Sequence, residues 1–342
     1  MRRTLAVLAC AALCAASCAT APPAPAVTHP AVAGPSFDQK LSSILRLEDQ
    51  RMLRDPAPPL PPAPPPVARG QKPAAVEAPP PAPPDLTRLL ADGDARIRRR
   101  AALAVGRVGM KDGAPPLVAA LGDSDPEVRQ MAAFALGLLG DKSARDALIA
   151  ALGDQAIAVR ASAAEALGLI GDASAADAIA KMAAPLVGGG AFAQPPTEAD
   201  EQRRDTPAGA VREAAYALVR LKAYPALASV VLDPAGQPVT PWWPIAYALS
   251  RIEDARAANA LMTLLKDEHP YTRAFALKGL GALKYRAAVP AVLALVSSPE
   301  SAIAVEAVRA LGKIGDPAAS ARLLTLARDP KTGATLRIET VS

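Results

Sequence analysis

The feature that most constrains this chain is a motif that returns at a fixed interval along the sequence. Three tracts, 97–106, 128–137 and 159–168, align without gaps as Ile/Val-Arg-x-x-Ala-Ala-x-Ala-Val/Leu-Gly. The apolar residue near the end of the motif returns at spacings of 31, 31, 51, 31, 31 and 31, as Val105, Leu136, Leu167, Leu218, Leu249, Leu280 and Leu311. Such a period indicates a repeat architecture, here with seven units and one insertion that lengthens a single interval.

Each unit carries two helical patterns. Residues 126–139 begin with Pro126 in the first turn, carry apolar residues at helical spacings and end at Gly140. A shorter pattern over 144–152 ends at Gly153. Neither helix can bury its apolar face within one hairpin, so successive hairpins must stack. The sequence therefore predicts an all-α solenoid of about seven helical hairpins.

The pattern Asp-x-x-Val-Arg-x-x-Ala-Ala-x-Ala-Leu-Gly-x-x-Gly-Asp, as it stands in residues 125–141, resembles the short bacterial HEAT-like repeat. The resemblance covers residues 86–342. It implies an armadillo-like α-solenoid that binds another protein through its stacked helix faces, and it does not identify the partner. Tetratricopeptide and ankyrin arrays have other periods and other signature residues.

Residues 1–17 have the layout of a secretory signal peptide, with two arginines before an apolar run and then small residues. Residues 15–18 (Ala-Ala-Ser-Cys) resemble a lipobox, which predicts lipidation of Cys18 and a lipid anchor in the membrane. The alternative is ordinary cleavage after Ala19, with Cys18 removed. Either way we expect an exported protein, periplasmic or anchored in the outer membrane as a lipoprotein.

Four further segments follow the signal peptide. We expect a disordered tail over 18–36, an isolated amphipathic helix over 37–54, a Pro-rich linker over 55–85 that separates the folded part from its anchor, and the repeat array over 86–342. The insertion falls at about 185–207 and has the composition of a loop, with or without a role in contacts. Adding 31 to Leu311 gives Ser342, so the array is expected to end inside an eighth repeat, as a truncated gene product would.

Two groups of residues are candidates for function. Trp242 and Trp243 stand side by side and are candidate partner-binding residues, or they fill a gap at an irregular helix start. Arginine recurs at one position of the motif, with Asp94, Asp125 and Asp267 in the preceding turns, and a ladder of Arg/Asp pairs between units is favoured over an anion-binding stripe: Arg98, Arg129, Arg160 and Arg273.

No catalytic constellation is visible in the sequence. The two histidines, His29 and His269, lie far from any Ser/Asp partner pattern, and all three cysteines lie in the leader. We therefore expect no cofactor, no metal site and no catalysis. A formal net charge of only +5 argues against nucleic acid as the partner. The function predicted is a protein-binding scaffold in the bacterial cell envelope.

Two alternatives remain open. The segment 37–51, the Pro-rich linker and the array resemble the N-terminal part of exported HEAT-array proteins that end in a cyclophilin-type peptidyl-prolyl isomerase domain. No cyclophilin motif is present in these 342 residues, so this chain would be the targeting part of such an enzyme. HEAT-like repeats also occur in bilin lyases, although a secretory leader fits a cytoplasmic lyase poorly.

Overall fold

The computed structural model describes residues 34–56, 82–192 and 194–341. Residues 37–342 form one unit, and within its described part the regular structure is helical, with two isolated β-bridges and no strand. The prediction of an all-α solenoid is confirmed. The expected signal peptide, most of the expected tail and Cys18 lie outside the described residues.

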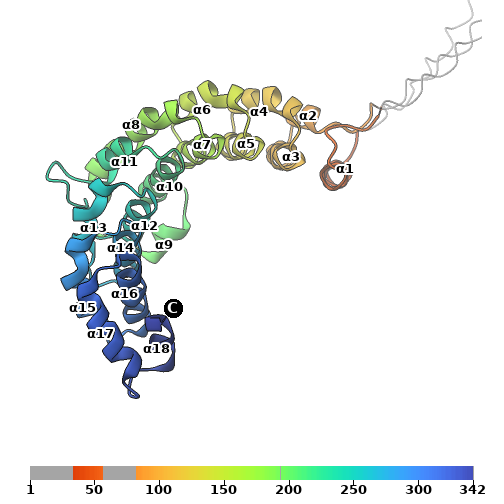
Figure 1. Ribbon diagram of the computed structural model, residues 1–342. Coiled ribbons are helices and arrows are strands. Elements are labelled where there is room, and N and C mark those ends of the chain that lie inside the picture. The colour runs from red at the N-terminus through yellow and green to blue at the C-terminus, as the bar shows by residue number, and fades with distance from the viewer. Residues whose placement is uncertain (1–33, 57–81, 193, 342) are drawn as a thin grey trace, which may run out of the picture. The chain divides into compact units, whose positions relative to one another are not determined.

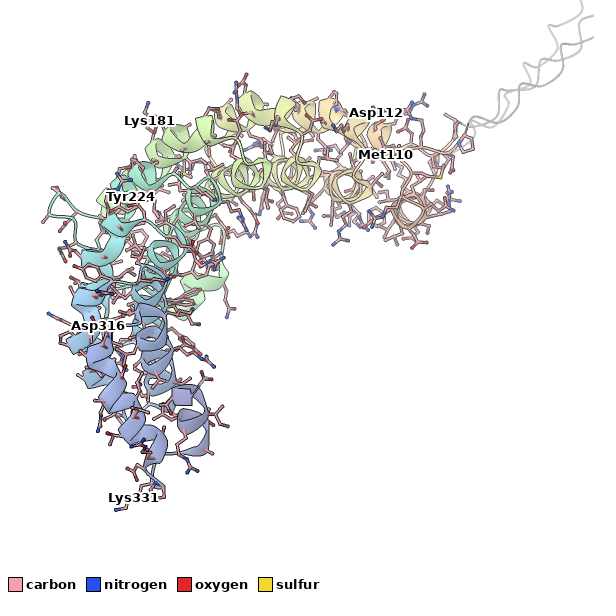
Figure 2. The ribbon with its side chains drawn as sticks, viewed as in Figure 1. Met110, Asp112, Lys181, Tyr224, Asp316 and Lys331 are labelled. Carbon is pink, nitrogen blue, oxygen red and sulfur yellow. The ribbon has the colours of Figure 1, made fainter. Side chains whose placement is uncertain are left out.

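Seven hairpins form the array, as predicted, and Figure 1 shows their helices in two rows along a curve. The first helices form the inner row: α3 (Ala95–Val108), α5 (Pro126–Leu139), α7 (Ile157–Ile170), α10 (Pro207–Arg220), α12 (Trp243–Arg251), α14 (Pro270–Ala282) and α16 (Ser301–Ile314). The second helices form the outer row: α4 (Ala114–Ala120), α6 (Arg145–Ala151), α8 (Ala176–Leu186), α11 (Tyr224–Val231), α13 (Ala258–Leu264), α15 (Val289–Leu295) and α17 (Pro317–Arg328). In Figure 2, Lys181 of α8 lies on the outer side.

Neighbouring inner helices approach each other through glycine and alanine. A Cβ atom added to Gly137 would lie 2.8 Å from the Cα of Ala166, and one added to Gly168 would lie 2.6 Å from the Cα of Ala217. These distances are shorter than carbon atoms tolerate, so the contact requires glycine on one helix and a small residue on the next. The small residues of the motif therefore set the spacing of the inner row.

The turn after each first helix needs one residue in the left-handed conformation, where glycine is least strained. Units one, two, three and seven place glycine there, with φ between 64° and 77°: Gly109, Gly140, Gly171 and Gly315. Units four, five and six instead place Lys222, Glu253 and Lys284 there, with φ of 53°, 54° and 50°. A left-handed non-glycine residue costs about 1–2 kcal/mol, so the middle of the array carries backbone strain that its ends avoid.

The expected isolated helix over 37–54 is shorter and is not isolated. Helix α1 (Phe37–Asp49) packs against α3, and Ile44 and Leu47 are fully buried in this contact. Its Glu48 accepts hydrogen bonds from two arginines of α3, Arg100 and Arg107. Helix α1 therefore lies beside α3 as one more member of the inner row (Figure 1).

The two ends of the Pro-rich segment are held together. The amide of Asp55 donates to the carbonyl of Pro84 at 3.0 Å, and the amide of Leu86 donates to the carbonyl of Leu53 at 2.8 Å. Helix α2 (Leu86–Leu89) follows at once and packs against α3. These contacts join the described ends of the segment, next to α1 and α2, while residues 57–81 lie outside the described residues. The expected role of this segment as a spacer from an anchor stays a prediction.

The insertion contains helical structure of its own. After α8 the chain makes one π-helical turn, η4 (Val187–Ala191), and later forms α9 (Glu198–Gln202), which begins with a capping box between Thr197 and Asp200. At the other end of the array, α18 (Ala334–Val341) packs against α16 and α17. It occupies the place expected for the first helix of an eighth unit.

Candidate functional site

Four aromatic side chains form a continuous tract on the inner row. They are Tyr216 on α10, Trp243 and Tyr247 on α12, and Phe275 on α14, and all four are half-buried. Tyr247 lies at the centre, with its ring centroid 5.0 Å from that of Tyr216 and 5.3 Å from that of Phe275, both edge to face. Trp243 stacks on Phe275 at 5.9 Å. These residues, here called the aromatic tract, join three consecutive units.

The tract has a helical origin. Trp243 and Tyr247 are four residues apart on α12, so they lie on the same helix face. Tyr216 and Tyr247 occupy the same position in two consecutive repeats, and stacking of the units brings them together. Half-exposed aromatic residues on a rigid helical support are the residue type that most often dominates protein interfaces.

The structure places the two adjacent tryptophans, predicted as a partner-binding pair, in different environments. Trp242 is only 3% exposed and packs against Phe192 of the insertion, with ring centroids 5.6 Å apart. It stands at the motif position that holds arginine in units one, two, three and six. Trp242 therefore belongs to the core, whereas Trp243 belongs to the aromatic tract.

The insertion folds back onto the inner row at α5 and α7. Arg204 pairs with Glu165 of α7, and its guanidinium lies over the ring of Phe134 of α5 at 5.8 Å. Both contacts are made with residues at the motif position that Tyr216 and Tyr247 occupy in units four and five. Arg204 of the insertion thus contacts the surface of α5 and α7 in units two and three.

Positive charge flanks the aromatic tract. Arg220 and Arg251 follow Tyr216 and Tyr247 by four residues, one helical turn later. The ammonium of Lys278 lies 5.2 Å from the ring centroid of Phe275. Such cation–aromatic contacts are favourable by about 0.5–1 kcal/mol at exposed sites. The tract therefore combines aromatic surface with cations.

Two arginines of the predicted ladder bind an aspartate of the following unit. Arg98 donates from Nε and Nη2 to both carboxylate oxygens of Asp123, at 2.7 and 2.8 Å. Arg129 does the same to Asp154, at 2.7 and 2.9 Å. Hydrogen bonds from the arginine hold the pKa of each carboxyl below its ordinary value. This geometry joins consecutive units and leaves both charges paired.

The ladder differs from the expectation in its partners. Asp94 and Asp125 cap their own helices and are not the partners of Arg98 and Arg129. Arg273 donates to the carbonyl of Asp267 at 3.1 Å and pairs with Glu300.

Arg160 is the exception in the ladder. Its side chain has no hydrogen-bond or ion-pair partner among the described residues, and its Nε is buried. The repeat position that supplies the aspartate in the two regular pairs is Pro185 in this unit. The ladder is therefore interrupted where the insertion begins.

The described residues contain neither a metal site nor a membrane span. No group of three or more His, Cys, Asp or Glu side chains is placed to hold a metal ion there. None of the helices in these segments combines the length and apolarity that a bilayer crossing requires.

Comparison with known protein families identifies the repeats. Residues 114–185 and 258–340 match HEAT repeats, and residues 97–123 match the PBS lyase HEAT-like repeat. A search of curated proteins found no match.

Solved structures provide relatives in fold. The protein YibA of Escherichia coli aligns with a TM-score of 0.50 and 19% identity, over 74% of this chain and 89% of that one. The complex of CpcE and CpcF of phycocyanin lyase from Nostoc sp. PCC7120 aligns with a TM-score of 0.42 and 24% identity, over 81% and 97%. Human deoxyhypusine hydroxylase aligns with a TM-score of 0.29 and 22% identity, over 75% and 92%. At 19% identity the likeness to YibA concerns the fold alone.

Proposed function

Because this chain is built of HEAT-like repeats, we propose that it is a non-catalytic scaffold that binds another protein on the inner row of its array. The single observation that carries the proposal is the aromatic tract, in which four half-buried rings from three units lie against one another. Stacked helical repeats create extended surfaces of this kind, and binding to other proteins is their usual role.

The rings of the aromatic tract are suited to act as anchors for a binding partner. Aromatic anchors concentrate binding energy when they are rigid and partly desolvated before the partner arrives. Tyr247 meets both conditions, since it is half-buried and held between Tyr216 and Phe275. At α5 and α7 the inner surface carries Arg204 of the chain itself. We therefore place the binding region on α10, α12 and α14.

Tyr247→Ala is expected to weaken capture of the partner at least about tenfold, because truncation of a central aromatic anchor typically costs about 2 kcal/mol or more. The measurement immobilises the chain, applies envelope extract at low and moderate salt, and quantifies each retained protein. Leu324→Ala is the matched control, since Leu324 is 53% exposed on the outer helix α17. Circular dichroism checks that both variants keep their helices. Equal retention by wild type and Tyr247→Ala would contradict the proposal.

For location we propose export and a lipid anchor at Cys18, supported by the layout of residues 1–18. Cys18→Ser is expected to move the protein from the membrane fraction to the soluble fraction, since the thiol that would carry the lipid is lost. Membrane association that persists in this variant would contradict the anchor.

A further inference from the structure

A pocket of about 610 Å³ lies beside the aromatic tract, at the C-terminal ends of α10 and α12. This volume is in the range of ligand pockets. Its walls include two apolar residues, two tyrosines of the tract and four charged residues: Val219, Ile252, Tyr216, Tyr247, Arg220, Lys222, Arg251 and Glu253.

The charges around the pocket do not neutralise one another. Three are positive and one is negative, and none of the four side chains has a hydrogen-bond or ion-pair partner in the described part of the chain. The arginines of the ladder differ, since Arg98 and Arg129 are bound to aspartates. Unpaired guanidinium groups that converge on one cavity are suited to a carboxylate, which accepts two parallel hydrogen bonds from each of them.

The backbone supplies a second, independent observation. Lys222 and Glu253 both line the pocket, and both stand in the left-handed conformation at the repeat position that is glycine in four of the seven units. Each side chain therefore reaches the pocket at a cost of about 1–2 kcal/mol that glycine would avoid. Strain of this kind gathers at functional sites, because a specific side chain is needed there.

We propose that this pocket binds a carboxylate of an acidic peptide segment that belongs to the partner protein, while the aromatic tract holds the apolar side chains next to it. The proposal rests on the proposed function and adds the chemistry of the partner. Arg220 and Arg251 bind the carboxylate, and Lys222 adds a third positive charge. The negative charge of Glu253 repels an acidic ligand and lowers its affinity. Ligands that bind through charge alone are therefore disfavoured.

The test measures binding of a fluorescent peptide of ten glutamates to the full chain by anisotropy. Lys222→Gly is expected to weaken binding about fivefold, the effect of one partly exposed ion pair. Glu253→Gly is expected to strengthen it by a similar factor. Lys284→Gly is the matched control, since Lys284 is also exposed and left-handed (φ 50°) but does not line the pocket. It removes the same charge and the same strain as Lys222→Gly, and binding should stay within about twofold of wild type.

The outcomes separate this proposal from its alternatives. Equal weakening by Lys222→Gly and Lys284→Gly would overturn it, because the attraction would then be non-specific. An oligothymidine of matching length that displaces the peptide and loses affinity in Lys222→Gly would also overturn it, in favour of a nucleic-acid ligand. If the peptide fails to bind while Tyr247→Ala still weakens capture from envelope extract, the pocket proposal fails and the proposed function stands. Loss of helicity is not expected in any glycine variant, since glycine is the usual residue at this position.

Discussion

One added methyl group at Gly168 is expected to destabilise the array by about 2 kcal/mol, because overpacking of a close contact typically costs about 1–3 kcal/mol. The Cβ atom of Gly168→Ala would lie 2.6 Å from the Cα of Ala217 and 2.7 Å from its Cβ. Both atoms belong to α10, so relief requires that two inner helices move apart. Alanine has the higher helix propensity by about 1 kcal/mol, which offsets part of the cost.

Gly312→Ala is the control for this prediction. Gly312 occupies the same motif position in unit seven, inside α16, and a Cβ atom added there meets nothing within 4 Å. The helix propensity of alanine then acts alone, and stability should be unchanged or rise by up to about 1 kcal/mol. Urea denaturation followed by circular dichroism measures both variants. A Gly168→Ala midpoint equal to that of Gly312→Ala would show that the inner helices are not in contact at this position.

The repeat period predicted most of this architecture from the sequence. The recurrence of the motif, at 31 residues in all but one interval, predicted the number of hairpins, and apolar spacing predicted which segments are helices. The positions of glycine within the motif also indicate where two helices approach closely, which the glycine content alone does not show. Gly168 lies inside α7, where glycine is unfavourable, and only the approach of α10 explains it.

Contacts between distant segments could not be predicted in this way. The composition of residues 55–85 is that of a linker, and it does not show that the amide of Leu86 bonds to the carbonyl of Leu53. Trp242 and Trp243 are adjacent in sequence, and only the position of Phe192 of the insertion shows which of them is buried. In both cases one of the two contacting residues lies outside the repeats, so the repeat period gives no information about the contact.

One signal of the candidate site was present in the sequence. Aligning the turn position across units shows glycine in four of them and Lys222, Glu253 and Lys284 in the other three. Departure from glycine at a left-handed position marks units four to six as unusual, and these are the units that carry the tract. The tract itself could not be predicted, because contact between Trp243 and Phe275 depends on how α12 and α14 pack.

Asp154→Ala is expected to destabilise the protein by about 3 kcal/mol, in the range found when one partner of a buried ion pair is removed. The side chains of Arg129 and Asp154 are 17% and 13% exposed, so solvent compensates little for the lost charge. Asp154 also accepts a hydrogen bond from the amide of Ala156 at 2.8 Å, which would lose its partner. Asp146→Ala is the control, since Asp146 is 81% exposed in its pair with Arg145 and should cost less than about 1 kcal/mol.

Acidification should separate Asp154→Ala from the wild type. The Arg129 guanidinium holds the pKa of Asp154 below its ordinary value of 3.8, so the folded state binds this proton less readily than the unfolded state. The stabilisation is therefore fully present above about pH 4 and is lost as the pH falls through the lowered pKa of the folded state. Urea midpoints measured between about pH 2 and pH 6 should fall less steeply in Asp154→Ala than in wild type. Parallel curves for wild type and Asp154→Ala would show that this pair does not couple the two units.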